Sequence, residues 1–333
     1  MIQDARVLQD EFIPREVEHR DHEMNALSRA LAPVTANEPA ETAFLFGPSG
    51  AGKTCLARYA LARLREAVID LNYQYVNCWQ DYTRFRALYR ILEGIGSTAD
   101  IHRQSTPTDA LLERLATYDG PEFVVILDEV DQLHDDDLLY DLYRTVGISM
   151  ILIANREEEL FARLDNRLVS RLHAATRIRF EKYELNELVS ILEDRVRWGL
   201  DEDVLSRKQL EWIADAAAGD ARVAIGILRS AAREAEQDDV ETIPDETVEA
   251  AIPRGRQEVK DKNIDQLTPH QKVLYEIIRE NDGVAPNLLY AEYNERVAEP
   301  RAERTVRNHL TKLAHYNLIE KHGKGRGRTY SLV

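Results

Sequence analysis

The segment GPSGAGKT at residues 47–54 has glycine, lysine and threonine at a spacing that suits phosphate binding. Gly47, Gly50 and Gly52 let the backbone N–H groups of the loop turn inward around an anion. Lys53 can reach the β- and γ-phosphates of a nucleotide, and the Thr54 hydroxyl can bind Mg²⁺. The pattern therefore predicts a site for ATP or ADP with Mg²⁺. The neighbouring residues expected to contact the nucleotide are Ala51 and Cys55.

Three polar residues follow apolar runs farther along the chain. Asp128 and Glu129 come after VVIL, where the first carboxylate can hold Mg²⁺ through water and the second can deprotonate an attacking water. Asn155 comes after SMILIA and can position that water near the γ-phosphate. Because ligands bind at the carboxyl ends of parallel strands, we expect the three side chains around one site. For Asn155 the alternative is a helix cap before the segment 156–161.

The elements that must position these residues are indicated by apolar runs that alternate with amphipathic segments. This alternation is typical of a parallel sheet covered by helices. After residue 184 strand patterns give way to helical periodicity, which predicts a separate all-helical unit up to about residue 252. The charged segment 253–263, which contains proline and glycine, predicts a linker. The expected strands are 43–46, 73–77, 123–128, 149–155 and 176–180.

Residues 268–333 show three helical patterns and then a short hairpin, which is typical of a winged-helix domain. Thr268 is the expected cap of the first helix, with Pro269 at its first position. In the third helix Val306, Leu310 and Leu313 can face a core together with Leu318, which leaves a polar face for the major groove of DNA. That face carries Arg304, Arg307, Asn308 and Lys312. The glycine-rich hairpin tip carries Lys324, Arg326 and Arg328, which can reach phosphates or the minor groove.

The charge distribution supports a local contact with DNA. The chain has a formal charge of −16, whereas residues 301–333 have eight basic against two acidic residues, a formal charge of +6. Because an acidic body repels polyanions, any nucleic-acid contact must be confined to such a patch. A winged helix that binds another protein is the alternative. The two cysteines, Cys55 and Cys78, and the charged N-terminal segment without an apolar run favour a reducing, cytoplasmic location near the nucleoid.

In this order the phosphate loop, the acidic pair and the polar asparagine resemble the AAA+ ATPases. Three further segments narrow the resemblance: FIPREVEHRDHEMNAL at 12–27, LDNRLVSRL at 164–172 and GDARVAI at 219–225. Together they are similar to archaeal replication initiators of the origin recognition complex subunit one / cell-division-cycle-six type. This resemblance implies that the segment 12–27 packs over the adenine. It also implies an arginine finger, which is either Arg167 or Arg171. The choice between these two arginines stays open because Asn166 occupies the position where the family often has proline.

The resemblance implies further contacts. Arg222 would turn toward the γ-phosphate, and Tyr183 and Arg195 would line the base. For Arg195 the alternative is an ion pair with Glu193 or Glu184. An insertion at about 78–100 would contact DNA through Arg84, Arg86 and Arg90, although the segment also fits a plain amphipathic surface helix.

We therefore expect an α/β fold with an AAA+ domain at 1–180, a helical lid at 181–255 and a winged helix at 264–333. The expected function is a slowly hydrolysing ATPase that binds duplex DNA at origins and uses hydrolysis as a switch. A winged-helix transcription regulator or signalling ATPase is the alternative, and an initiator paralogue with a plasmid or regulatory duty is a third interpretation. The implied partners are origin elements, the replicative helicase and other initiator paralogues, with the protein a monomer before it assembles on DNA.

Overall fold

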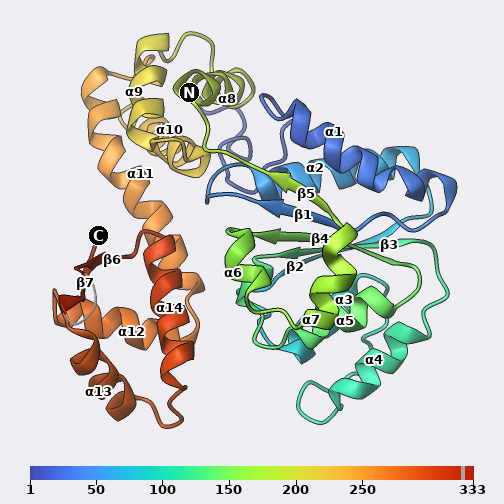
Figure 1. Cartoon of the computed structure of the whole chain (residues 1–333). Helices are drawn as coiled ribbons and strands as arrows, with labels where there is room; N and C mark the ends of the chain where they lie inside the picture. Colours follow the sequence, from blue (N-terminus) through green and yellow to red (C-terminus); the bar gives the residue numbers. More distant parts are fainter. Residues whose placement is uncertain (324–326) are drawn as a thin grey trace. The chain divides into compact units, whose positions relative to one another are not determined.

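The computed structural model describes residues 1–323 and 327–333, which form two compact units, Met1–Ile252 and Pro253–Val333 (Figure 1). The first unit contains a five-stranded parallel sheet in the order β2-β3-β4-β1-β5. The expected strands are confirmed to within one residue at each end. They are β1 (Ala43–Phe46), β2 (Asn72–Asn77), β3 (Phe123–Asp128), β4 (Ile148–Ala154) and β5 (Thr176–Arg179).

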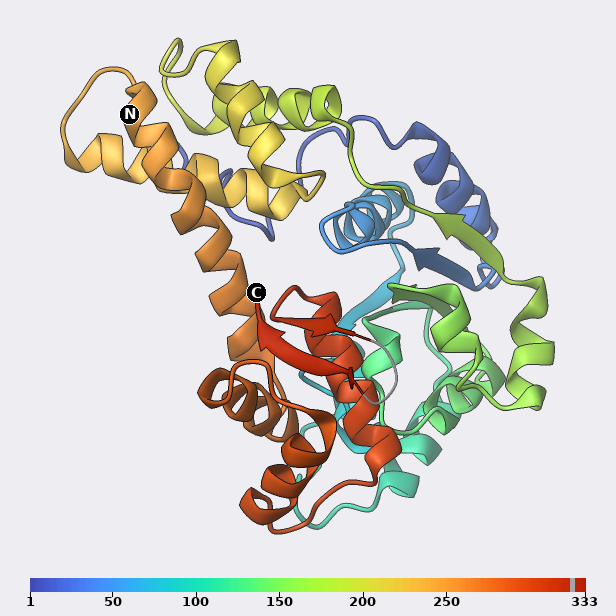
Figure 2. The same cartoon turned by 60° about the vertical axis from the view of Figure 1, so that its left-hand side comes forward.

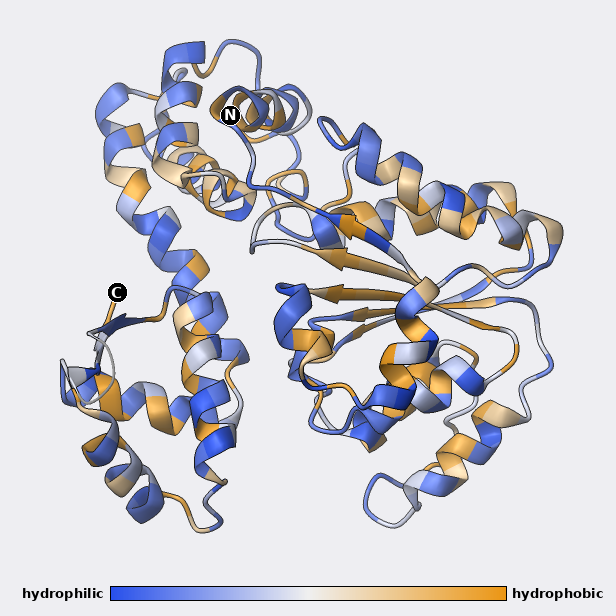
Figure 3. Ribbon diagram, viewed as in Figure 1, coloured by the Kyte–Doolittle hydropathy of each residue, from blue (hydrophilic) through white to orange (hydrophobic). Residues whose placement is uncertain are grey.

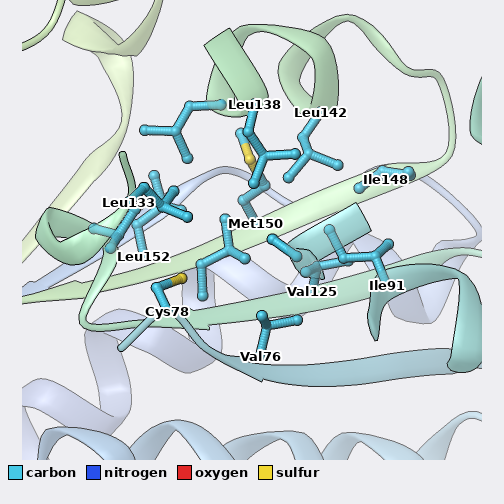
Figure 4. Close-up of a cluster of buried hydrophobic side chains, with 14 of the residues drawn as sticks. Val76, Cys78, Ile91, Val125, Leu133, Leu138, Leu142, Ile148, Met150 and Leu152 are labelled. Carbon is cyan, nitrogen blue, oxygen red and sulfur yellow. The ribbon is translucent and has the colours of Figure 1, made fainter. Parts of the chain in front are cut away.

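Helices cover both faces of this sheet, because successive strand side chains point to opposite faces. Along β3, Val124 and Ile126 pack with α1 and α2, whereas Phe123, Val125 and Leu127 pack with the helices of the other face. Figure 4 shows this second face, where Val125 and Met150 meet Leu138 and Leu142 of α5. Figure 3 shows the same arrangement as apolar strands between helices with polar outer surfaces. The helices are α1 (Asp21–Leu31) and α2 (Lys53–Ala67) on one face, and α3 (Arg84–Glu93), α4 (Thr108–Ala116), α5 (Asp137–Arg144), α6 (Glu157–Phe161) and α7 (Asn166–Arg171) on the other.

A helical lid follows the sheet within the first unit. Its helices are α8 (Leu185–Gly199), α9 (Arg207–Ala217), α10 (Ala221–Gln237) and the first part of α11 (Asp245–Gln266). They share one apolar core, to which Leu8 near the N-terminus also contributes. Figure 2 shows the N-terminal segment running along these helices, and backbone bonds from Gln3 and Asp4 to the Gly199 carbonyl fix it there.

The expected linker at 253–263 is wrong, because these residues lie inside α11 and Pro253 is accommodated within the helix. The segment after the proline consists mainly of residues with good helix propensity. Val259 and Asn263 are also buried in the second unit, so tertiary packing favours the helical conformation.

The second unit is a winged helix. Its elements are the end of α11, α12 (Pro269–Glu280), α13 (Pro286–Arg296), α14 (Glu303–His315), β6 (Ile319–His322) and β7 (Thr329–Leu332). The strands β6 and β7 pair antiparallel, and Val284 bridges to Tyr330. Thr268 caps α12 as expected, and Leu310, Leu313 and Leu318 are fully buried. Among the described residues, no helix has both the length and the apolar character needed to cross a membrane.

Candidate functional site

The phosphate loop joins β1 to α2 at the carboxyl end of the sheet. Gly50 and Gly52 have φ angles of 73° and 90°, which residues with a side chain rarely adopt. Gly52 is the residue before the first turn of α2, so the loop presents the N-terminus of a 15-residue helix. A Cβ at Gly52 would lie 2.4 Å from the Tyr183 hydroxyl. Glycine is therefore required here both for its conformation and for its lack of a side chain.

The Lys53 side chain is buried at the base of this loop, with 8% of its surface exposed. Its ammonium group donates to the Gly47 and Pro48 carbonyls, each at 2.7 Å, and to Asn155 Oδ1 at 3.3 Å. Burial lowers the pKa of Lys53 to about 8, although the carboxylate of Asp128 acts in the opposite direction. The residue at the N-cap position of α6 is Arg156 and not Asn155, so the alternative of a helix cap is not the position that Asn155 occupies.

Asp128 lies at the end of β3 next to the phosphate loop. Its Oδ2 accepts hydrogen bonds from Thr54 Oγ1 at 2.6 Å and from the Tyr75 hydroxyl at 2.9 Å. A hydroxyl and a carboxylate in contact form the oxygen donor set that Mg²⁺ prefers in nucleotide sites. The chemistry of these residues therefore fits a magnesium-bound phosphate.

Glu129 follows directly and lines the same pocket. Its φ angle of 54° lies in the left-handed region that non-glycine residues seldom adopt. Such conformations cluster at functional sites, where the surrounding structure holds them in place. The structure thus brings the expected acidic pair and Asn155 to one end of the sheet, beside Lys53.

The lid reaches the phosphate loop through the start of α10. Arg222 donates to Ser49 Oγ at 2.5 Å and to Asp220 Oδ2 at 3.3 Å. Asp220 also caps α10, and a Cβ at Gly50 would lie 2.0 Å from its Oδ1. Sheet and lid therefore meet closely at the phosphate loop, and Arg222 contacts this loop directly through the Ser49 hydroxyl.

One pocket of about 170 Å³ lies within the first unit, and its polar lining includes Ser49, Lys53, Thr54, Asp128, Glu129, Asn155 and Arg222. Tyr183, Ile191 and Ile225 supply its lid wall, and residues of the N-terminal strap, which we define as residues 1–18, supply another. Arg20 follows the strap and lies over the Tyr183 ring, 4.1 Å from its centre. An apolar wall beside a cationic phosphate loop can receive a base at one end and phosphates at the other. The strap residues in the wall are Asp10, Pro14, Glu16, Val17 and Glu18.

Arg195 lines this pocket but bonds to the strap. It donates to the Val7 carbonyl at 2.7 Å and the Phe12 carbonyl at 3.4 Å, and lies over the Phe12 ring. The alternative ion pairs for Arg195 are not formed: Glu193 pairs with Arg207, and Glu184 belongs to the capping box of α8.

A second arginine, Arg229, has 1% of its surface exposed and donates to the Leu8 carbonyl and to Asp10. Two arginines of the lid therefore hold the strap against it.

The two finger candidates lie outside the pocket. Arg167 and Arg171 are exposed on α7, and their guanidinium groups lie 5.7 and 5.0 Å from the centre of the Tyr140 ring. Arg167 is also paired with Asp165 at 2.8 Å.

The arginines of the insertion segment lie on α3. Arg84 pairs with Asp141 and Asp135 of the α5 region, and Arg90 pairs with Asp81 and Glu93. Arg86 is exposed and donates weakly to the Gln80 carbonyl at 3.4 Å. Two of the three cations are thus engaged within the first unit.

In the winged helix, Arg304, Arg307 and Asn308 are exposed on α14, opposite the buried Val306 and Leu310. Lys312 is half-buried, as is Arg328 before β7. Lys324 and Arg326 lie outside the described residues.

Sequence reasoning missed four residues around the pocket: Tyr75, Ser49, Asp220 and Arg229. Asp220 could have been found, since an aspartate after glycine and before a helical pattern indicates a cap. Tyr75 and Arg229 carried no such signal, because a tyrosine in a strand and an arginine in a helix are commonplace.

Two family models match the chain: an AAA domain over residues 37–164 and a Cdc6 AAA+ ATPase-type lid domain over residues 189–253. ORC1-type DNA replication protein 9 of Halobacterium salinarum is 52% identical over 333 residues, which span 100% of this chain and 94% of that protein.

The fold is shared with solved structures, among them two from Aeropyrum pernix. The Aeropyrum pernix ORC1 protein in complex with DNA has a TM-score of 0.78 and 26% identity, covering 99% of this chain and 93% of that chain. The Aeropyrum pernix ORC2 protein in ADPNP-ADP complexes has a TM-score of 0.67 and 23% identity, covering 99% and 94% of the two chains.

Proposed function

The chain belongs to the ORC1-type (Cdc6) family of DNA replication initiators with an AAA+ ATPase core, and on this premise we propose how it works. It binds ATP or ADP with Mg²⁺ in the pocket between its sheet (1–180) and its lid (181–255), and duplex DNA through its winged helix (264–333). The bound nucleotide is a switch that sets the conformation of the first unit.

The convergence of four segments on one pocket carries the proposal. The phosphate loop, the ends of β3 and β4 and the start of α10 contribute Lys53, Asp128, Asn155 and Arg222 to a single wall. A magnesium-bound polyphosphate suits these groups. Lys53 and Arg222 are the cations, the Thr54 hydroxyl lies beside a carboxylate, and the N-terminus of α2 faces the loop. Each of these groups comes from a different part of the chain, and their meeting at one pocket supports a phosphate ligand.

The roles follow from position. Thr54 and Asp128 would hold Mg²⁺, which neutralises charge on the phosphates when bound. Glu129 accepts a proton from the attacking water, and Asn155, which accepts a bond from Lys53, orients that water. Arg222 exchanges its bond with Ser49 for one with the γ-phosphate. Arg167 or Arg171 would act only on the nucleotide of a neighbouring copy, since both lie on the surface of α7.

Slow turnover is supported by the way in which the pocket is enclosed. The strap is held to the lid by Arg195 and Arg229, so a bound base would be covered from two sides. Release then requires the strap and the lid to move together. A nucleotide that leaves slowly suits a switch better than a motor.

The DNA contact rests on the winged helix. Arg304, Arg307 and Asn308 form an exposed row on α14, as a helix in the major groove requires. This module also carries the basic excess of an otherwise acidic chain. Phosphate contacts by such residues give the affinity, and base contacts by the same helix give the sequence preference. Origin DNA is the ligand implied by the family.

The test compares wild type with the double variant Arg304→Ala/Arg307→Ala in anisotropy titrations of a labelled duplex at several salt concentrations. Loss of two phosphate contacts should weaken binding and flatten the slope of log K against log salt by about 2. The matched control is Arg63→Ala/Arg156→Ala, which removes the same charge from exposed positions of the first unit.

Equal slopes for the two double variants would exclude α14 as the DNA contact. In parallel, Lys53→Ala should abolish binding of a fluorescent ATP analogue, and an unchanged affinity would exclude the phosphate loop.

A further inference from the structure

Tyr75 contacts the candidate cation site although nothing in its sequence context indicates such a role. It lies in β2, and its hydroxyl donates to Asp128 Oδ2 at 2.9 Å. The same oxygen accepts the Thr54 hydroxyl at 2.6 Å. One carboxylate oxygen therefore receives two O–H donors from opposite neighbours, a strand and a helix.

The ring of Tyr75 is held so that its hydroxyl has little freedom. In the β2–β3 pairing, Tyr75 lies opposite Ile126, two residues before Asp128. The half-buried ring packs against the apolar cluster beneath α2, and the Arg58 guanidinium lies 5.6 Å from its centre. Because the ring is fixed by packing, the position of the hydroxyl is determined by the fold and not by a flexible side chain.

The chemistry of a tyrosine suits this position. Its phenolic hydroxyl is an uncharged group that can donate one hydrogen bond, and here it donates that bond to Asp128. A neutral donor orients a carboxylate without cancelling its charge, whereas a lysine or arginine would compete with a cation for it. Asp128 is itself buried, with 6% of its surface exposed, so water cannot easily replace the missing donor.

We propose that Tyr75 is a positioning residue for the nucleotide-bound magnesium ion, which holds Asp128 in the orientation that Thr54 and the hydrated cation require. When Thr54 directs an oxygen lone pair to the cation, its hydrogen needs an acceptor, and Asp128 Oδ2 is that acceptor. Tyr75 keeps this oxygen in place. Groups that orient metal ligands in this way typically change metal affinity by about 10- to 100-fold when they are removed. The inference rests on the proposed nucleotide site.

The experiment measures binding of mant-ADP to the full chain, first in EDTA and then across a MgCl₂ titration. Tyr75→Phe keeps the ring and removes only the hydroxyl. Its affinity in EDTA should match wild type, while the Mg²⁺ concentration that gives half of the magnesium-dependent gain should rise about 10-fold. Tyr73→Phe is the matched control, since Tyr73 lies two residues earlier on the same strand with its ring beneath Arg65, and it should behave as wild type. Thr54→Ala should lose the magnesium-dependent gain altogether.

Two outcomes overturn the inference while leaving the nucleotide site intact. One is an unchanged magnesium requirement in Tyr75→Phe. The other is an equal loss of mant-ADP affinity with and without Mg²⁺, which would make the hydroxyl a purely structural group. If wild type itself binds no mant-ADP, the proposed function fails together with the inference. If it binds equally well in EDTA and MgCl₂, the nucleotide site stands, but the magnesium role proposed for Thr54 and Asp128 fails together with the inference.

Discussion

We predict that ADP affinity falls as the pH rises above about 8, because the phosphate-binding lysine is buried. Burial lowers the pKa of Lys53 to about 8 before nucleotide binds. A bound phosphate raises the pKa of Lys53 again, since a nearby anion favours the charged form. Binding therefore requires the protonated lysine, and above pH 8 it must first take up a proton.

The magnitude follows from this linkage. Below the pKa of about 8, Lys53 is already charged and ADP affinity does not depend on its titration. Above it, each pH unit lowers affinity about tenfold, or about 1.4 kcal/mol, so that ADP should bind roughly tenfold more weakly at pH 9 than at pH 7.

The free energy of unfolding changes in the opposite direction. The folded-state pKa of Lys53 lies below its ordinary value of 10.5, so the buried charge lowers stability below about pH 8. This penalty of about 3 kcal/mol disappears as the pH rises toward 10.5.

The assay is a calorimetric titration of ADP with excess Mg²⁺ at constant ionic strength, from about pH 7 to about pH 9.5. Lys53→Arg is the control, because guanidinium stays charged over this range and should give a flat profile even if its affinity is lower. Burial raises the pKa of the Cys55 thiol, so this neighbouring group does not titrate earlier than an ordinary cysteine.

A flat profile for wild type would contradict this prediction, since it would mean that Lys53 is protonated at all these pH values. A decline that is equal in wild type and Lys53→Arg would also refute it, because another group would then be responsible.

Two further predictions concern the enclosure of the pocket. Arg229→Met should lower the free energy of unfolding by about 3 kcal/mol, since it removes a buried guanidinium and leaves the half-buried carboxylate of Asp10 without its cation. Chemical denaturation checks this against Arg207→Met, an exposed ion-pair arginine of the lid that should change stability by less than about 1 kcal/mol. Gly50→Ala should weaken ADP binding more than about tenfold, because its Cβ would meet Asp220 at 2.0 Å and push the lid away. Gly96→Ala is the control, because Gly96 has a similar φ of 70° but no described residue lies near its Cβ position. Titration of both variants with mant-ADP separates the contact with Asp220 from backbone strain. Equal affinities for the two variants would contradict the role of the contact between Gly50 and Asp220.

The sequence predicted most of the fold because its signals are local. Apolar runs located all five strands of the parallel sheet. On α14, the spacing of apolar and charged residues predicted which face is buried, with Val306 and Leu310, and which face carries the exposed arginines. The family resemblance, which rested on motif order, is confirmed by the shared lid and AAA domains. The linker expected at 253–263 was wrong. Its charge and its proline and glycine favoured a linker, but the other residues have good helix propensity, and the burial of Val259 and Asn263 in the second unit was not visible in the sequence.

By itself the amino-acid sequence determined which segments become strands and helices, and which loop can receive a phosphate, because these properties depend on residues within one or two turns of each other. Which distant side chains meet depends on the folding of the whole first unit, as in the contacts of Tyr75 with Asp128, Arg222 with Ser49, and Arg195 with the carbonyl of Val7. The last two pairs are separated by 173 and 188 residues. Their contacts depend on how the sheet, the lid and the strap close on one another, and no spacing along the chain specifies that closure.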